Sequence, residues 1–217
     1  MMWSSDESGR GTDNLKTEED ICKSDKEPEL MPNRICYDIM KILPPIKPYR
    51  VLDIGCGEGK DAVFFAKCGY AVTAFDRSGQ RIDKARRLAA HNKVEVDFFK
   101  ADIFEYCPDT EYDIIFSSGV LHFLPEIDRK EFCNSLKSHT ADHGINVLDV
   151  FVKKPFIIRT SDAAGDEDKK HPWLSGELFE YYHDWLFHIC REEVFGCSSG
   201  VRPHKHCMDT LIAQKVR

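Results

Sequence analysis

The fold is decided by residues 49–60, Tyr-Arg-Val-Leu-Asp-Ile-Gly-Cys-Gly-Glu-Gly-Lys. Its first half contains a short apolar run, 51–54, which is typical of a buried parallel strand. Three closely spaced glycines follow, and they permit positive φ and a close approach of a ligand to the bare backbone. Apolar residues at helical spacing come next, at Ala62, Phe64, Phe65 and Ala66. The stretch therefore predicts a strand, a glycine loop and a helix.

Two acidic residues, Asp53 before the loop and Glu58 within it, indicate the kind of ligand. A dinucleotide loop holds a pyrophosphate at a helix N-terminus, and carboxylates placed there would repel it. The same carboxylates suit a ligand that carries an ammonium and a sulfonium group, and this chemistry points to S-adenosylmethionine. A glycine turn that binds nothing is the alternative, but the glycine spacing, Asp53 and the following helix all agree with a ligand site.

The stretch resembles motif I of the class I S-adenosylmethionine-dependent methyltransferases, and three later segments match that family in the right order. The resemblance implies that Asp76, with its neighbour Arg77, grips the ribose after the run 71–75. It places the adenine edge at Asp102 and Ile103. It places the methionine end at residues 113–118, which are the fourth strand and its exit. The cofactor residues implied in full are Asp53, Gly55, Cys56, Gly57, Gly59, Asp76, Arg77, Asp102, Ile103, Ser117 and Ser118.

Strand and helix patterns alternate along the rest of the chain. We expect strands at 51–54, 72–75, 94–98, 114–117 and 145–152, and an antiparallel pair at 186–193 and 207–215 at the edge of the sheet. Helices are expected from 31–33 to 43, at 61–68, from Ser78 onward, after Pro125 with Ile127, Phe132 and Leu136, and at 175–185. The prediction is an α/β, Rossmann-like methyltransferase fold: a mostly parallel seven-stranded sheet with helices on both faces.

Composition bounds the domain organisation and the partners. Residues 1–29 are poor in apolar groups and are expected to be a disordered acidic arm, and 30–217 to be the methyltransferase domain. The net charge of −7, without a basic stripe, argues against nucleic acid as a partner. No apolar run reaches membrane-spanning length and no signal peptide is recognised, so we expect a cytoplasmic protein. The nine cysteines form no C-x-x-C pair, so no metal is expected. A monomer or weak homodimer is expected.

The two ends of the chain narrow the family further. Residues 176–185, with Gly-Glu-Leu, a Tyr-Tyr pair and Trp185, resemble the G-E-L-x-x-Y-Y-x-x-W segment of the tellurite-resistance (TehB-type) methyltransferases. Arg34 matches an arginine upstream of that group's glycine loop, and 210–215 resembles its final strand. That group carries a histidine–arginine pair between its last two strands. No such pair is in register here, so the roles of Arg202, His204 and His206 stay open.

The resemblance implies methyl transfer to a small soft nucleophile, either a thiol or a chalcogen oxyanion such as tellurite or selenite. Such a nucleophile needs little help from a base, because the enzyme mainly positions and desolvates the partners. Arg34 and Arg202 are the candidates for holding an anionic acceptor, with surface ion pairs as the alternative. His122 is a candidate base or pocket residue, with plain packing as the alternative. A macromolecular acceptor and a non-catalytic cofactor-binding module also remain open, and the 153–172 loop is a candidate substrate loop.

Overall fold

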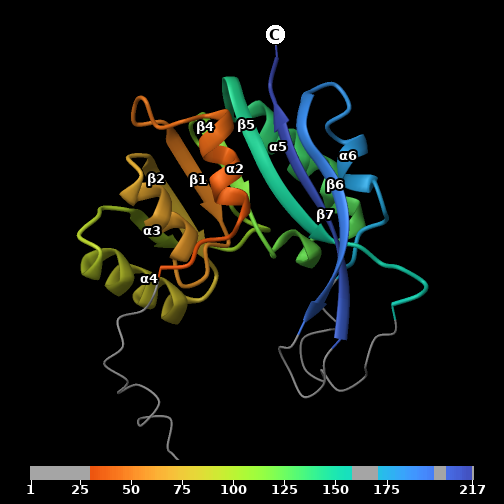
Figure 1. Cartoon of the computed structure of the whole chain (residues 1–217), viewed down its shortest axis with the longest axis horizontal. Helices are drawn as coiled ribbons and strands as arrows, with labels where there is room; N and C mark the ends of the chain where they lie inside the picture. The colour runs from red at the N-terminus through yellow and green to blue at the C-terminus, as the bar shows by residue number, and fades with distance from the viewer. Residues whose placement is uncertain (1–29, 158–170, 198–203, 217) are drawn as a thin grey trace, which may run out of the picture.

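A mixed sheet lies at the centre of the protein (Figure 1). The computed structural model describes residues 30–157, 171–197 and 204–216. Within these residues the sheet has seven strands in the order β3-β2-β1-β4-β5-β7-β6. The strands from β3 to β5 pair in parallel, and β7 runs antiparallel to both β5 and β6. The expected arm at 1–29, most of the expected loop at 153–172 and Arg202 lie outside the described residues.

The strands and helices have the following bounds. The strands are β1 (Arg50–Ile54), β2 (Ala71–Asp76), β3 (Asp97–Lys100), β4 (Tyr112–Ser117), β5 (Thr140–Phe151), β6 (Leu186–Cys197) and β7 (His204–Gln214). The helices are α2 (Ile35–Ile42), α3 (Lys60–Lys67), α4 (Gly79–His91), the short 3-10 helix η1 (Leu121–Phe123), α5 (Glu126–Ser138) and α6 (Glu177–Glu180). The predicted alternation, and the antiparallel pair at the sheet edge, are therefore confirmed.

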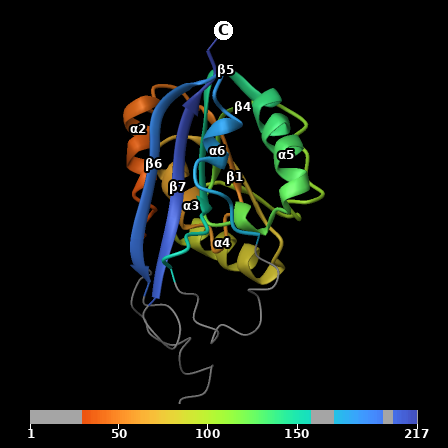
Figure 2. The same cartoon turned by 90° about the vertical axis from the view of Figure 1, so that its right-hand side faces the viewer.

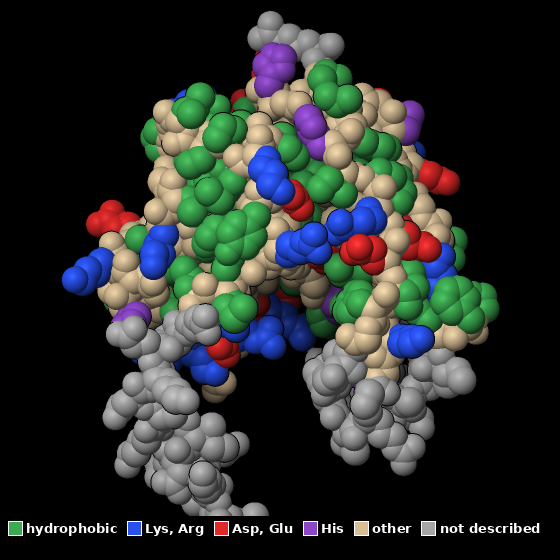
Figure 3. All heavy atoms as spheres, viewed as in Figure 1, with side chains coloured by type: hydrophobic (Ala, Val, Ile, Leu, Met, Phe, Trp, Pro, Cys, Tyr) green, Lys and Arg blue, Asp and Glu red, His purple; other side chains and the backbone are tan. Residues whose placement is uncertain are grey.

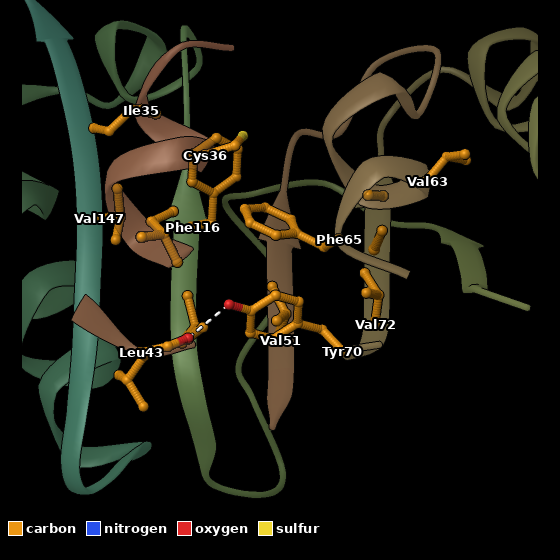
Figure 4. Packing of buried hydrophobic residues seen from close by; sticks show 14 of the residues in the cluster. Ile35, Cys36, Leu43, Val51, Val63, Phe65, Tyr70, Val72, Phe116 and Val147 are labelled. Carbon is orange, nitrogen blue, oxygen red and sulfur yellow. Dashed lines mark hydrogen bonds between the residues drawn. The ribbon is translucent and has the colours of Figure 1, made fainter. Parts of the chain in front are cut away.

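Helices cover both faces of the sheet, and α2 and α5 lie on opposite sides of it (Figure 2). On one face, α2, α3 and α4 pack on the sheet around buried residues such as Ile39, Phe65 and Phe116. Figure 4 shows this cluster, in which the Tyr70 hydroxyl donates a hydrogen bond to the carbonyl oxygen of Leu43 at 2.6 Å. On the other face, α5 and α6 pack against residues that include Leu148. Each face thus contributes its own apolar core to stability.

Some predicted boundaries were wrong. The third strand was expected at 94–98, but β3 starts at Asp97, because the backbone N–H of Val94 instead closes the end of α4 on the carbonyl of Ala89. The helix expected at 175–185 is one turn, α6, preceded by Gly176 in the left-handed region and followed by turns. β5 begins at Thr140, five residues earlier than expected. These errors concern ends of elements, where local hydrogen bonds outweigh the apolar pattern.

The buried stripe of α5 also differs from the expected one. Ile127 is 87% exposed, whereas Arg129, Cys133 and Leu136 face the core. The i, i+4, i+7 spacing of these three residues is the helical period that Ile127 does not fit. A charged residue thus occupies a core position that sequence patterns assign to an apolar one.

Candidate active site

The glycine loop between β1 and α3 is held against the end of β2. The backbone N–H groups of Gly55 and Cys56 both donate to the carbonyl of Phe75 at 2.9 Å. Gly55 has φ +73°, and a Cβ atom there would lie 2.2 Å from Cγ2 of Val120. Gly57 has φ +57°, and nothing among the described residues lies within 4 Å of where its Cβ would be. Gly55 is therefore required by packing, while Gly57 leaves the backbone open to a ligand.

A cavity of about 120 Å³ lies beside this loop. Of the predicted cofactor residues, Gly55, Asp76, Arg77, Asp102 and Ile103 line it. The sequence missed its remaining lining residues, which are Phe75, Arg81, Ala101, Phe104, Gly119, Val120 and Phe123. Most of these residues contribute apolar side chains or backbone to the cavity. The available sequence signal for them was their position next to a predicted cofactor residue. The cavity lies at the carboxyl ends of the strands, where open α/β sheets bind their ligands.

Asp76 fixes the shape of this cavity. One carboxylate oxygen accepts the N–H of Gly57 at 3.1 Å and the other accepts the N–H of Ser78 at 2.8 Å. The side chain is 5% exposed. Two backbone hydrogen bonds use only part of the acceptor capacity of a carboxylate, so Asp76 can still accept hydroxyl groups.

Asp53 lies buried at the end of β1 and is 2% exposed. Its Oδ2 atom has no hydrogen-bond partner among the described residues. Burial raises the pKa of Asp53 well above its usual range, and the nearby carboxylates of Asp61 and Asp76 raise it further. An unpaired buried acceptor is costly, so this arrangement favours a ligand that donates hydrogen bonds and carries positive charge.

The other predicted cofactor residues do not line the cavity. Cys56, Gly57 and Gly59 form the loop itself, and Gly59 contacts Ala85 and Phe98 instead, since a Cβ there would lie 2.6 Å from the Cβ of Ala85. Ser117 is buried and donates to the carbonyl of Ile54 at 3.2 Å, which ties β4 to β1.

A polar network that the sequence did not reveal surrounds Ser118. The Ser118 hydroxyl donates to Asp149 at 2.6 Å and accepts the side-chain N–H of Asn33 at 2.9 Å. Asp149 also accepts the N–H of Gly119 at 2.6 Å, and the N–H of Asn33 donates to Asp61 at 2.6 Å. Burial raises the pKa of Asp149 to about 6, although the two hydrogen bonds oppose this. A carboxylate in the run 145–152, where Asn146 is the other polar residue, was the sequence signal for Asp149.

The predicted catalytic residues have different positions. Arg34 is the exposed residue that precedes α2, next to Asn33, and it makes no ion pair with the described residues. His122 is 4% exposed in η1, with its ring 4.3 Å from Phe123 and 4.9 Å from Phe151, centroid to centroid. The structure thus brings His122 to the same edge as the cofactor cavity. In Figure 3 the molecule is hollowed along its lower edge, where the parallel strands of Figure 1 end.

The segment that resembles G-E-L has a structural role. Both carboxylate oxygens of Glu177 accept a hydrogen bond from Nη1 of Arg129, each 2.9 Å long, and Oε2 also accepts the backbone N–H of Leu174 at 2.9 Å. The Arg129 guanidinium also lies 4.5 Å from the ring centroid of Trp173 and donates to the carbonyl of His171 at 2.6 Å. The Tyr182 hydroxyl accepts a hydrogen bond from buried Asn146 at 2.9 Å. These contacts join α5, α6 and β5 on the face away from α2.

Comparison with known proteins agrees with this site. Residues 51–144 match the family described as methyltransferase domain. The fold matches the crystal structure of TehB from Haemophilus influenzae with a TM-score of 0.73 and 24% identity, over 84% of this chain and 62% of that one. These matches agree with the antiparallel edge of the sheet, with the glycine loop after β1 and with the acid at the end of β2. The chain is therefore similar to the class I S-adenosylmethionine-dependent methyltransferases, and its residues 51–144 match a methyltransferase domain.

The chain is also similar to several curated proteins. The probable S-adenosyl-L-methionine-dependent methyltransferase TehB of Haemophilus influenzae is 27% identical over 150 residues, covering 69% of this chain and 50% of that protein. Hemagglutinin 1 of Eikenella corrodens is 27% identical over 181 residues, 82% of this chain and 58% of that protein. A ubiquinone biosynthesis O-methyltransferase of Rickettsia bellii is 30% identical over 132 residues, 58% and 54% respectively. The chain thus spans about half the length of these relatives.

The residues of this edge fit the cofactor of that class. The unpaired oxygen of Asp53 matches an ammonium group, and Asp76 keeps acceptor capacity for ribose hydroxyls. Ile103 and Phe104 give the cavity an apolar side that suits an adenine ring. Within the described residues no helix is long and apolar enough to cross a membrane, and no three His, Cys, Asp or Glu side chains form a group that could hold a metal ion.

Proposed function

We propose that this chain transfers the methyl group of S-adenosylmethionine to a small soft nucleophile, either a thiol or a chalcogen oxyanion such as selenite or tellurite. The observation that carries the proposal is the buried, unpaired carboxylate oxygen of Asp53 next to an open glycine loop. A cationic ligand offsets the cost of burying that group. The similarity to TehB over 69% of the chain supports the methyl transfer.

The cofactor end has a division of roles among its side chains. When bound, S-adenosylmethionine supplies an electrophilic methyl group on a positively charged sulfur. Asp53 accepts hydrogen bonds from the ammonium group, and Asp76 accepts them from the ribose. Ile103 covers the adenine, and Asp102, whose own Oδ1 accepts the N–H of Phe104 at 3.1 Å, holds that turn in place. These residues bind and orient the methyl donor, and orientation is the main contribution that a methyltransferase makes.

The acceptor end needs positioning more than proton transfer. A thiolate or a chalcogen oxyanion is already a nucleophile, so a general base is dispensable. Arg34 holds an anionic acceptor, because it is exposed beside Asn33 and has no ion pair with the described residues. His122, buried between two aromatic rings, lines the acceptor side and excludes water. Arg202 is a further candidate that lies outside the described residues.

A second candidate is methylation of a hydroxyl group. The similarity to a ubiquinone biosynthesis O-methyltransferase, 30% identical over 132 residues, favours it. A hydroxyl must lose its proton during transfer, and His122 is the residue that would take it. The two candidates therefore differ in how strongly the rate depends on His122.

The test is a panel of acceptors with release of S-adenosylhomocysteine as the readout. We expect turnover with small thiols or with selenite and tellurite, and little with peptides or phenols. Replacing Arg34 with Ala should raise KM for selenite and leave the cofactor affinity within a factor of about three. Arg87, an exposed residue of α4, provides the matched control as Arg87→Ala. Turnover limited to peptides or phenols would overturn the acceptor class, and cofactor binding without any turnover would indicate a binding module.

A further inference from the structure

A row of rings leads away from the cofactor cavity. Phe123 lines the cavity, and His122 lies next to it with 4.3 Å between ring centroids. Phe151 lies 4.9 Å from His122, and His206 lies 4.9 Å from Phe151. His204 continues the row, 4.6 Å from His206. We call these five residues the ring row.

The ring row lies where an acceptor must bind. Its members come from η1, which follows β4, from the last residue of β5 and from the start of β7. These positions lie together because Phe151 pairs with Met208 across the β5–β7 ladder, two residues from His206. They are at the carboxyl ends of the parallel strands, the edge at which open α/β sheets bind ligands. The row begins at a residue of the cofactor cavity, so it points from the methyl donor into the acceptor space.

Charge along this edge disfavours an oxyanion at the centre of the row. Asp149 precedes Phe151 by two residues and lies on the same face of β5. Its carboxylate is 3% exposed, and its partners in the described residues are neutral, namely the Ser118 hydroxyl and the Gly119 N–H. Among the described residues, the cation–ring contact of the row is made by Arg77, 5.2 Å from the ring centroid of Phe123, at the cofactor end. An anion over Phe151 would therefore meet a buried carboxyl group, and within the described residues no lysine or arginine lies over the Phe151 ring to balance it.

Aromatic faces instead favour a flat, polarisable and uncharged molecule. Rings stack or meet edge to face with other rings, and sulfur makes favourable contacts with aromatic rings. We propose that the acceptor is a thiol with an aromatic or other flat apolar body, held against the ring row with its sulfur toward Phe123 and the cofactor cavity. This inference rests on the proposed methyl transfer and selects the thiol from the two soft nucleophiles considered there.

The reaction balances without a further reagent. The acceptor sulfur forms the new bond to the methyl carbon, while the bond from that carbon to the sulfonium sulfur breaks and leaves its electron pair there. The sulfonium becomes a neutral thioether, and the thiol proton passes to solvent. The products are the methyl thioether of the acceptor, S-adenosylhomocysteine and a proton. In this scheme Phe151 and His206 determine specificity and take no part in bond making.

The experiment compares two thiols of similar acidity that differ in their bodies, benzyl mercaptan and 2-mercaptoethanol, with selenite as the anionic arm. For the unmodified chain we expect kcat/KM about tenfold higher for benzyl mercaptan than for 2-mercaptoethanol. Phe151→Leu and His206→Gln keep side-chain bulk and remove the rings, so both should shrink this ratio several-fold through KM for benzyl mercaptan. The matched controls are Phe187→Leu and His91→Gln. Phe187 lies near the start of β6, whereas the end of β6 pairs with His204 of the ring row, and His91 lies on α4.

A binding measurement separates this inference from the proposed function. Calorimetry of benzyl mercaptan with the complex of the chain and S-adenosylhomocysteine should show binding that weakens in Phe151→Leu and not in Phe187→Leu. If that pattern is found but no acceptor is methylated, the ring row binds the aromatic thiol as inferred, and the proposed methyl transfer is contradicted. If selenite or 2-mercaptoethanol is the better substrate, or if Phe151→Leu slows both thiols equally, the ring row does not select the acceptor and the inference is overturned.

Discussion

Replacing Glu177 with Gln tests the buried ion pair that holds α6 to α5. The Arg129 side chain is 3% exposed and the Glu177 side chain 13%. The substitution keeps the shape and one acceptor oxygen but removes the negative charge, so Arg129 stays buried without a counter-charge among the described residues. Breaking one partner of a buried pair costs about 3–5 kcal/mol. The lower end applies here, because the carbonyls of His171 and Leu124 still accept hydrogen bonds from Arg129.

A loss of about 3 kcal/mol should lower the melting temperature by roughly 6–12 °C for a domain of this size. Urea unfolding gives the free energy directly, and an unchanged m-value would show that the native state is intact. Glu131→Gln, at an exposed site in the middle of α5, should change stability by less than about 0.5 kcal/mol. Affinity for S-adenosylhomocysteine should stay the same in both variants. A loss below about 1 kcal/mol for Glu177→Gln would refute the reasoning, since the pair would then behave like a surface one.

Three further predictions concern the cofactor edge. Asp76→Ala should weaken S-adenosylhomocysteine binding by about 1–3 kcal/mol in calorimetry, and unchanged affinity would remove Asp76 from the site. Gly55→Ala should lower stability and cofactor affinity, since its Cβ would lie 2.2 Å from Val120 Cγ2 at φ +73°; an unaffected variant would show that the loop shifts freely. The pKa of Asp149 is raised to about 6, so its contribution to stability is lost as the pH rises through that value. The free energy of unfolding should therefore decrease less between about pH 4 and 6 in Asp149→Asn than in the unmodified chain. Equal decreases in the two proteins would contradict this.

The sequence was sufficient for the parts of the fold that depend on local order. The apolar residues of 51–54, the glycines after them and the acid at position 76 belong to one strand–loop–helix–strand unit, so the loop and the β1–β2 edge could be predicted. The seven strands followed from alternation of apolar runs with helical patterns. Ends of elements were less certain: Val94 has the residue type of a strand, but its N–H is used by the cap of α4.

The Ser118 network could not be predicted, because its members are far apart in the chain. Asn33 and Ser118 are separated by 85 positions, and Ser118 and Asp149 by 31. Hydrophobic periodicity places a strand in a sheet but does not say which polar side chains its neighbours will bring to it. The ring row has the same origin, since only the β5–β7 pairing places His206 beside Phe151.

The resemblance of residues 176–185 to the G-E-L-x-x-Y-Y-x-x-W segment narrowed the choice of methyltransferase group, but it carries little information about the acceptor. Glu177 binds Arg129, Leu178 is fully buried, and the Tyr182 hydroxyl meets Asn146, so the segment secures the sheet on the face that lacks α2. Asp149, with Asn33 and Ser118, instead belongs to the network beside the cofactor cavity. Two chains can therefore share this segment, and with it the same scaffold, while their acceptors differ. In our proposals the identity of the acceptor depends on Arg34 and the ring row, and these are the residues whose substitution should change it.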